Sequence, residues 1–485
     1  MSHNKRYISS VKYDVLANLV TKAGYLISSV ILARALDIQD FGIVAIALSF
    51  NIILSELTGF GLGSGIINSS KTSDMVIRSA FYLNVLTGTV LTIAMVFISP
   101  YIATEYDLFH YLDVFLLFTI VIFLTSIVRI PEAIFSKQMN FRLLSRIEIL
   151  SSVMAILFAI YSALGLKIGI YSLVVLHLSK LLIKTVVIVY LNRWILRFEL
   201  SIESLKGIWG YSQHLYKIHI LYTITNNFEA IFIGKQFNVT TLALYTRAKS
   251  TQQMFIHTLL GSVSKVLFPS ISQVKDDREK VHKIMRALLL IVSYLIFSFT
   301  AILILTAEEV VVFLYSEKWR EAHVYLEYVL VSGVLTYIAT LLDSAIKGVG
   351  ESKRLFKIDL IRRGGYVLTI VASSFIGFME MLLGIVIISA INLVITIIIY
   401  SKIMNSSNKQ VFLGVFKNLL ISICVGVVTH VLSENIMDPA WGELTRIAII
   451  TSIYIATILI VSIGVRNSAA YLLLDYFSTL RGGKK

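Results

Sequence analysis

Ionisable residues inside long apolar stretches are the part of this sequence whose types and spacing could do chemistry. A charge near the middle of a bilayer costs roughly 2.5 to 3.5 kcal/mol on insertion scales, so it usually faces a cavity or an ionic partner. His177, Lys180 and Lys184 recur at helical spacing and therefore share one face of a helix. Core packing explains a basic stripe poorly, so the spacing favours the lining of an anion-accepting cavity. In the alternative, Lys184 extends to the inner interface and Lys180 pairs with a carboxylate elsewhere.

Other bases in apolar stretches could face the same cavity. Arg129 either lines it or is neutralised by Glu132, which lies one helical turn away. Pro131, between them, predicts a local break in the helix, and freed backbone groups are tolerated best beside a polar cavity. The remaining candidates for this cationic, substrate-binding cavity are Lys22, Lys217 and Lys249.

Acidic residues are fewer in the same stretches. Glu56 and Glu229 could carry a proton or bind sodium in a coupled cycle, but we favour the interpretation that they are counter-ions for the lysines. Asp343 precedes Lys347 by one helical turn, which predicts an ion pair between these two side chains.

The sequence contains no signature of catalysis. It has no Gly-x-x-x-x-Gly-Lys-Ser/Thr nucleotide loop, and no His-Glu-x-x-His motif or Cys/His cluster offers a metal site. A run of alternate glycines consists of Gly59, Gly61, Gly63 and Gly65. These glycines end an apolar helix instead of following a strand, so they indicate close helix packing or a flexible helix end, not a dinucleotide loop. We therefore predict a protein that is not an enzyme and uses neither cofactor nor metal.

The elements that must position these residues are membrane-spanning helices. Hydrophobic residues form 57% of the 485-residue chain, charged residues form 15%, and the mean hydropathy is +0.81. A soluble protein could not hide that much apolar surface. A spanning helix needs ~20 apolar residues, and about fourteen such segments predict an all-α multi-pass membrane protein. Their expected ranges are 13–35, 42–66, 79–103, 110–135, 146–166, 168–192, 212–234, 241–268, 284–306, 322–346, 358–378, 381–402, 411–433 and 444–465.

The net charge of +14 would suggest a nucleic-acid partner if the protein were soluble. Here most lysines and arginines fall on the loops that share a side with the amino terminus, and few fall on the opposite loops. The positive-inside rule places these basic loops, and with them both termini, in the cytoplasm. The excess of basic residues therefore indicates how the chain is oriented in the membrane, and we expect no nucleic-acid partner.

An internal repeat organises the spans into two halves. Residues 31–47 align without a gap with residues 232–248, and each copy joins two apolar segments through a base and a short polar turn. Six spans are an even number, so the seventh span would start from the same side of the membrane as the first. The two halves would therefore be parallel repeats. The match also favours a retained first helix over a cleaved signal peptide. We predict an N-lobe with spans 1–6 (1–192), a linker (193–211), a C-lobe with spans 7–12 (212–402), and an extra hairpin with spans 13–14 and a cytoplasmic tail (403–485).

The linker has a pattern of its own. Apolar residues recur at helical spacing after Ser201, which predicts a short helix lying in the inner interface. The alternative is an ordinary polar connector.

The motifs, taken in order, resemble those of the Wzx-type polysaccharide and O-antigen flippases. These belong to the multidrug/oligosaccharidyl-lipid/polysaccharide (MOP) exporter superfamily, and the resemblance is closest to the branch with the colanic acid exporter. The motifs cover about residues 10 to 400: Leu32-Ala33-Arg34-Ala35-Leu36, Asp40-Phe41-Gly42, Arg129-Ile130-Pro131, Met139-Asn140-Phe141-Arg142, Gly169-Ile170-Tyr171-Ser172-Leu173-Val174, Ile233-Gly234-Lys235, Leu244-Tyr245-Thr246-Arg247-Ala248, Leu267-Phe268-Pro269 and Lys318-Trp319. Each is short, but their order and spacing are specific. Tyr171 stands where tryptophan is common, and Asp37-Ile38 replaces a Gly-Pro turn.

The resemblance implies two six-helix lobes in a V around a central cavity that opens alternately inward and outward, as in MATE transporters. It implies a bacterial inner-membrane flippase for undecaprenyl-pyrophosphate-linked oligosaccharides, serving O-antigen, capsule or exopolysaccharide synthesis. Expected partners are this lipid-linked glycan, the lipid bilayer, and a polysaccharide polymerase with other assembly proteins. Within the cavity we expect Lys22, Lys180 and Lys184 to bind the pyrophosphate, with Arg129 as a fourth cation.

Three other functions fit the sequence less well. A cation-coupled multidrug exporter on the same fold is the nearest alternative, but it would need mainly acidic intramembrane charges. A membrane-embedded glycan enzyme usually needs a large periplasmic loop. A non-transporting scaffold would leave the buried bases unexplained.

Overall fold

The computed structural model describes the backbone of residues 20–69, 72–274, 277–404, 409–436, 438, 441–465 and 467–471. Every regular element in these ranges is helical. The expected start of the first span, residues 13–19, and both chain termini lie outside the described residues.

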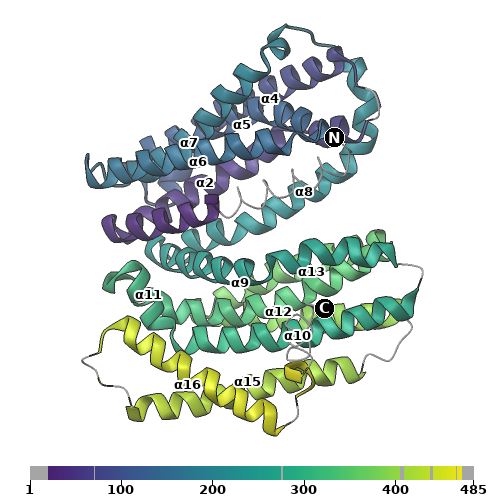
Figure 1. Cartoon of the computed structure of the whole chain (residues 1–485). Coiled ribbons are helices and arrows are strands. Elements are labelled where there is room, and N and C mark those ends of the chain that lie inside the picture. Colours follow the sequence, from purple (N-terminus) through teal and green to yellow (C-terminus); the bar gives the residue numbers. More distant parts are fainter. Residues whose placement is uncertain are drawn as a thin grey trace, which may run out of the picture. The chain divides into compact units, whose positions relative to one another are not determined.

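The chain divides into two compact units, Met1–Thr246 and Arg247–Lys485, which are described separately. The first unit contains a helix over 20–35. Its other helices are α2 (Ile38–Thr58), α3 (Leu62–Asn68), α4 (Asp74–Glu105), α5 (Leu112–Lys137), α6 (Phe141–Leu164), α7 (Tyr171–Leu191) and α8 (Ile202–Gln236), with short helices η1 (Phe109–Tyr111) and η2 (Arg193–Leu196) (Figure 1).

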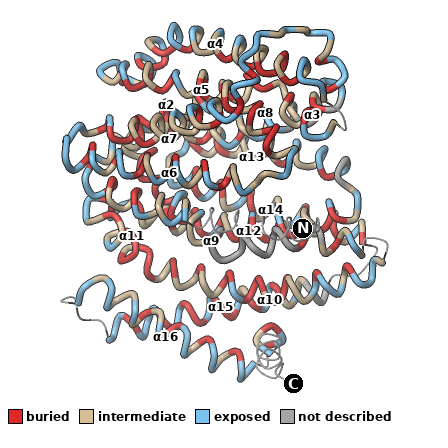
Figure 2. The backbone as a smooth tube through the Cα atoms, turned by 45° about the horizontal axis from the view of Figure 1, so that its top comes forward, coloured by how far each residue is buried: buried red, intermediate tan, exposed pale blue. Residues whose placement is uncertain are grey.

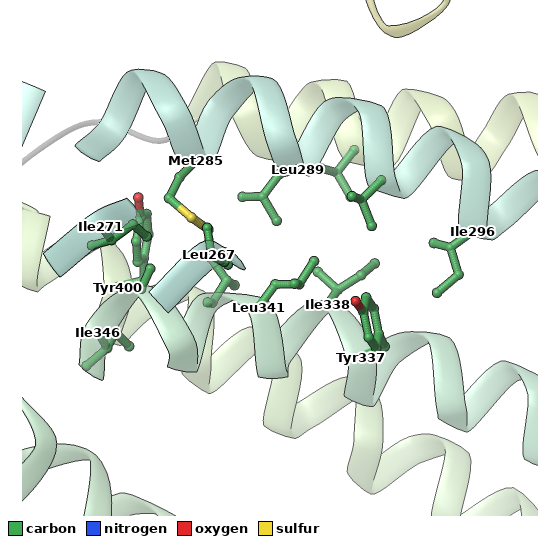
Figure 3. Close-up of a cluster of buried hydrophobic side chains, with 14 of the residues drawn as sticks. Leu267, Ile271, Met285, Leu289, Ile296, Tyr337, Ile338, Leu341, Ile346 and Tyr400 are labelled. Carbon is green, nitrogen blue, oxygen red and sulfur yellow. The ribbon is translucent and has the colours of Figure 1, made fainter. Parts of the chain in front are cut away.

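The second unit begins within α9 (Val239–Gln273). It continues through α10 (Arg278–Leu305), α11 (Ala307–Tyr315), η3 (Glu317–Trp319), α12 (Ala322–Gly348), α13 (Ser352–Ser374), α14 (Phe378–Met404), α15 (Lys409–Ile436) and α16 (Glu443–Gly464). Its largest apolar core joins α9, α10, α12 and α14, where Leu267, Met285, Leu341 and Tyr400 are almost fully buried (Figure 3). The pair α15 and α16 packs beside α10.

Ten of the described helices are long and apolar enough to cross a membrane: α2, α4, α5, α6, α7, α10, α12, α14, α15 and α16. Each of the fourteen predicted segments overlaps a helix, and the second splits into α2 and α3. Only 22% of the apolar window is buried in each of α4 and α16, and exposed residues recur along both helices (Figure 2); Phe97 on α4 is 78% exposed. Such apolar faces need lipid around them. The all-α membrane fold predicted from the sequence is therefore confirmed.

Both copies of the repeated turn fold as helix–turn–helix. Asp37 precedes α2, and in the second copy Asn238 precedes α9, where its Oδ1 accepts a hydrogen bond from the Thr241 amide at 2.7 Å. The two turns also pack together within the first unit, because a Cβ on Gly42 would lie 2.2 Å from the Val239 carbonyl oxygen. A Cβ on Gly234 would likewise meet Ile46 at 2.8 Å. The predicted repeat hairpin is thus confirmed.

The glycine run serves close helix packing. Gly61 has a left-handed backbone (φ 72°) and starts α3, and a Cβ there would lie 2.8 Å from the Ser212 carbonyl oxygen of α8. A Cβ on Gly65 would lie 2.9 Å from the Ile208 carbonyl oxygen. The interpretation as a packing motif is confirmed.

Two local expectations were wrong. The linker does not contain a separate interfacial helix, because α8 runs unbroken from Ile202 and buries Leu205 and Ile208 against α3. Helix α5 also continues through Pro131, where a break was expected. Tertiary packing on neighbouring helices offsets the local cost of the proline. The lobe boundaries at 192 and 212 remain a prediction.

Candidate functional site

Six charged side chains from four helices gather inside the first unit. Helix α2 contributes Glu56, α5 contributes Arg129 and Glu132, α6 contributes Glu148, and α7 contributes Lys180 and Lys184. All six lie on helices that are long and apolar enough to span a membrane. We call this set the charged network.

One carboxylate at the centre of the charged network holds two lysines. The Lys180 Nζ lies 2.7 Å from Oε1 of Glu148, and the Lys184 Nζ lies 3.2 Å from its Oε2. Lys184 also contacts Glu132 Oε1 at 2.5 Å. The structure therefore shows Lys180 paired with a carboxylate from another helix, as the alternative interpretation expected. Lys184 is paired with carboxylates in the same way.

The network remains accessible although it is embedded among helices. The side chains of Lys180, Lys184 and Glu148 are 27%, 20% and 33% exposed. The same partial exposure screens their attraction, so each pair contributes less to stability than a sealed one would.

Arg129 binds a different acid from the one expected. Its Nη2 lies 3.0 Å from Glu56 Oε2, and Nη1 donates to the Glu56 backbone carbonyl at 3.4 Å. A Cβ on Gly59 would lie 2.2 Å from Nη1, so the glycine leaves the space that the guanidinium fills. Of the two alternatives for Arg129, the described contacts do not show neutralisation by Glu132, because Glu56 on α2 binds Arg129 and Lys184 on α7 binds Glu132.

The helix over 20–35 reaches the network through Tyr25. The Lys180 Nζ lies 4.9 Å from the Tyr25 ring centroid, a cation–π distance. Lys22 is exposed and precedes Tyr25 by three residues, so it lies on the same face of this helix. This helix packs tightly on α6, since a Cβ on Gly24 would lie 3.0 Å from Ile156.

His177, the third residue of the basic stripe, has a different environment. It packs edge-on against the Phe118 ring of α5, with centroids 6.0 Å apart. In the described contacts the stripe therefore divides into two lysines that hold carboxylates and a histidine that packs on an aromatic ring.

The other candidate residues lie elsewhere. Lys217 is exposed on α8, and Lys249 is half-buried on α9 in the second unit. Glu229 is buried on α8 and accepts a hydrogen bond from the Tyr245 hydroxyl at 2.6 Å. Glu56 binds an arginine, and the described contact of Glu229 is with a tyrosine, so the role of these two acids as counter-ions for lysines stays a prediction.

Glu148 is the residue of the site that sequence reasoning missed. Glu148 is a charged residue inside the predicted span 146–166, and this same property identified the other candidate residues. Its partners follow it by more than thirty residues, so no local spacing could pair them.

Two arginines among the described residues of the second unit are buried. Arg362 on α13 lies 3.1 Å from Asp343 Oδ2 on α12 and donates to the Thr396 hydroxyl at 2.7 Å. The structure thus gives Asp343 a different ion-pair partner from the predicted Lys347. The Arg247 guanidinium is buried 4.9 Å and 5.0 Å from the ring centroids of Tyr315 and Trp319.

Two apolar pockets of about 490 and 360 Å³ lie in the first unit, between α2, α4 and α8. Side chains such as Met95, Ile98 and Leu91 line them. None of the charged network lines either pocket. Hydrocarbon suits these pockets, whereas an anionic group suits the network.

The sequence is similar to proteins of polysaccharide biosynthesis. The model of a family described as "Polysaccharide biosynthesis protein" matches residues 31–324. The lipopolysaccharide biosynthesis protein WzxC of Escherichia coli (strain K12) is 22% identical over 441 residues, which cover 89% of this chain and 88% of WzxC. The succinoglycan biosynthesis transport protein ExoT of Rhizobium meliloti (strain 1021) is 24% identical over 359 residues, which cover 74% of this chain and 72% of ExoT.

Solved structures share the fold at lower identity. The lipid II flippase MurJ, in an inward closed conformation, matches with a TM-score of 0.67 and 14% identity over 93% of this chain and 99% of MurJ. An inward-facing MATE family transporter of the MOP superfamily matches with a TM-score of 0.64 and 12% identity over 81% of this chain and 98% of the transporter. The fold is therefore that of MurJ and the MATE transporters.

Proposed function

The chain belongs to the polysaccharide biosynthesis protein family, and from this premise we propose that it is a flippase for lipid-linked oligosaccharides. It would move undecaprenyl-pyrophosphate-linked repeat units from the cytoplasmic to the periplasmic leaflet of a bacterial inner membrane. WzxC, ExoT and MurJ support this proposal by their described roles in lipopolysaccharide, succinoglycan and lipid II handling. Both termini would be cytoplasmic, and a polysaccharide polymerase and other assembly proteins would take the product.

The observation that carries the proposal is the pair of partly exposed lysines on α7. Lys180 and Lys184 present two ammonium groups one helical turn apart within a predicted span. Two adjacent cations match the two phosphates of a pyrophosphate, and lysine binds phosphate as a point charge that tolerates changing geometry. Lys22 would be a third cation from the helix over 20–35. Arg129 is the weakest of the expected four, because Glu56 engages its guanidinium from two sides.

Transport would follow from alternating access to this site. A ligand shifts a conformational equilibrium only by as much as it binds the two states differently. The two states would bind the ligand differently if the lysines contacted carboxylates in one state and pyrophosphate oxygens in the other. The glycan would occupy the polar cavity, and the lipid tail would stay in the bilayer.

A cation-coupled multidrug exporter on the same fold remains the alternative, since a MATE transporter shares the architecture. Such an exporter needs intramembrane carboxylates that are available to a cation. In the charged network Glu56, Glu132 and Glu148 each already hold an arginine or a lysine. These carboxylates would have to lose their cations before they could bind another one.

The test is made in the native host. Deleting the gene should cause undecaprenyl-pyrophosphate repeat units to accumulate on the cytoplasmic leaflet, and the wild-type gene should clear them. Lys180→Ala should reduce clearance by roughly tenfold or more, because a charge-assisted bond is worth about 1.5 to 3 kcal/mol. Lys206→Ala, which changes a lysine that is 76% exposed, is the matched control and should behave as wild type.

Two results would contradict the proposal. Surface glycan that stays normal without any lipid-linked intermediate, in a host with no second flippase, would favour the drug exporter. Full activity of both lysine variants would remove the substrate site from α7.

A further inference from the structure

A single carboxylate occupies both lysines of the proposed site. The two oxygens of Glu148 contact Nζ of Lys180 and Nζ of Lys184 separately, at 2.7 Å and 3.2 Å. Glu148 therefore holds the lysines as a small bidentate anion would. Among the described residues, the Tyr25 ring and His177 lie near Lys180, and Glu132 contacts Lys184.

Any anion that binds these lysines must displace Glu148 or compete with it. A ligand with one negative charge replaces one carboxylate charge by another and leaves Glu148 among apolar helices with no cation. A carboxylate that is only 33% exposed loses stabilisation when its cations leave, although solvent screening reduces the loss. A ligand with two or more negative charges offsets that loss, because it attracts both ammonium groups more strongly than one carboxylate does.

We propose that Glu148 is a specificity-determining residue that excludes singly charged headgroups and admits pyrophosphates. Specificity depends on the difference between the affinities for two ligands. A carboxylate that competes for the same lysines lowers the binding of a weakly bound headgroup more than the binding of a pyrophosphate. The membrane around the protein is rich in phospholipids whose headgroups carry one phosphodiester charge. Without such a competitor these lipids would fill a site made of two exposed lysines. This inference rests on the proposed function.

A purely structural role for Glu148 makes a different prediction. If it only ties α6 to α7, its loss lowers stability and leaves the ratio of affinities unchanged. Glu148→Gln keeps the shape of the side chain and an oxygen that accepts a hydrogen bond from one lysine, but it removes the competing charge.

The experiment uses the full chain, purified in nanodiscs of zwitterionic phosphatidylcholine. The probes are farnesyl pyrophosphate and farnesyl methyl phosphate, a phosphodiester with one negative charge, and the readout is the ratio of their dissociation constants. We expect wild type to prefer the pyrophosphate by roughly tenfold. Glu148→Gln should bring this ratio closer to one, mainly by tightening the binding of the singly charged phosphodiester. The matched control, Glu105→Gln, changes a carboxylate that pairs with Lys235 in the same unit and should keep the wild-type ratio.

The outcomes separate this inference from the function on which it rests. Wild type that prefers the pyrophosphate while Glu148→Gln keeps the same ratio overturns the role of Glu148 alone. Wild type that binds neither probe contradicts the proposed anion site itself. If Glu148→Gln does not fold, Glu148→Asp serves, because its shorter carboxylate cannot reach both lysines. A wild-type ratio in that folded variant also overturns the inference.

Discussion

Arg129 is fixed to α2 through its whole guanidinium group. It donates to both the side chain and the backbone carbonyl of Glu56, and Gly59 leaves the space beside it. A planar, always-charged fork suits such a multiple contact better than an ammonium would. At this residue several contacts join one acid and one base, whereas the two lysines of α7 share the carboxylate of Glu148.

The Arg129–Glu56 pair should therefore be worth measurable stability. Arg129→Met keeps much of the side-chain volume but leaves the Glu56 carboxylate without its cation. We expect a loss of about 2 kcal/mol in the free energy of unfolding, less than the roughly 3 to 5 kcal/mol of a fully buried pair, because both side chains are 24% exposed.

A double-mutant cycle in detergent micelles measures the pair itself. Glu56→Gln combined with Arg129→Met should lose less than the sum of the single variants, with a coupling of about 1 kcal/mol. Additive losses would mean that the contact at 3.0 Å contributes no net stability.

At the scale of helices, the sequence predicted the structure better than it predicted the contacts within the charged network. Apolar runs and polar turns are local properties, and the span expected at 168–192 became α7 at Tyr171–Leu191. The resemblance to polysaccharide flippases, inferred from short motifs, was also confirmed. Two of these motifs meet in the second unit, where Arg247 packs on Trp319.

The ion partners could not be predicted in the same way. Local spacing paired Arg129 with Glu132 and Asp343 with Lys347, but α2 and α13 supply the actual partners, Glu56 and Arg362. Helix spacing shows which residues share a face. Which helix packs against that face depends on tertiary contacts that no periodicity records.

The repeated turns allow a test of helix packing. Gly42→Ala would place a Cβ 2.2 Å from a backbone oxygen of Val239, which cannot rotate away. We expect it to lower the free energy of unfolding by roughly 1 to 3 kcal/mol, the range for overpacking. Gly364→Ala is the matched control, since no atom lies within 4 Å of its Cβ in α13.

The control should gain stability where the test variant loses it. Alanine is about 1 kcal/mol more favourable than glycine inside a helix, so Gly364→Ala should unfold at the same or a higher temperature than wild type. Unchanged stability of Gly42→Ala would show that the two turns can separate at no cost.

At the scale of the whole molecule, the chain forms two compact units, and the lobe boundaries stay a prediction. The first unit extends to Thr246 and includes α8, which covers α3 with Leu205 and Ile208.

We expect a fragment of residues 1–246 to accumulate in membranes and a fragment of residues 1–192 to be degraded. Immunoblots of membrane fractions measure both. Leu205→Asp in the longer fragment should lower its amount, and equal amounts of all three fragments would refute the packing role of α8.

The place of α8 has a consequence for synthesis. A ribosome adds about 5 to 20 residues per second, so seconds pass between the emergence of α7 and that of α8. During that interval Leu62 and Ile66 of α3, both fully buried in the folded protein, have no cover from the helix that later packs on them. The nascent first half must therefore be shielded by lipid or by the insertion machinery until the chain has grown past Gln236.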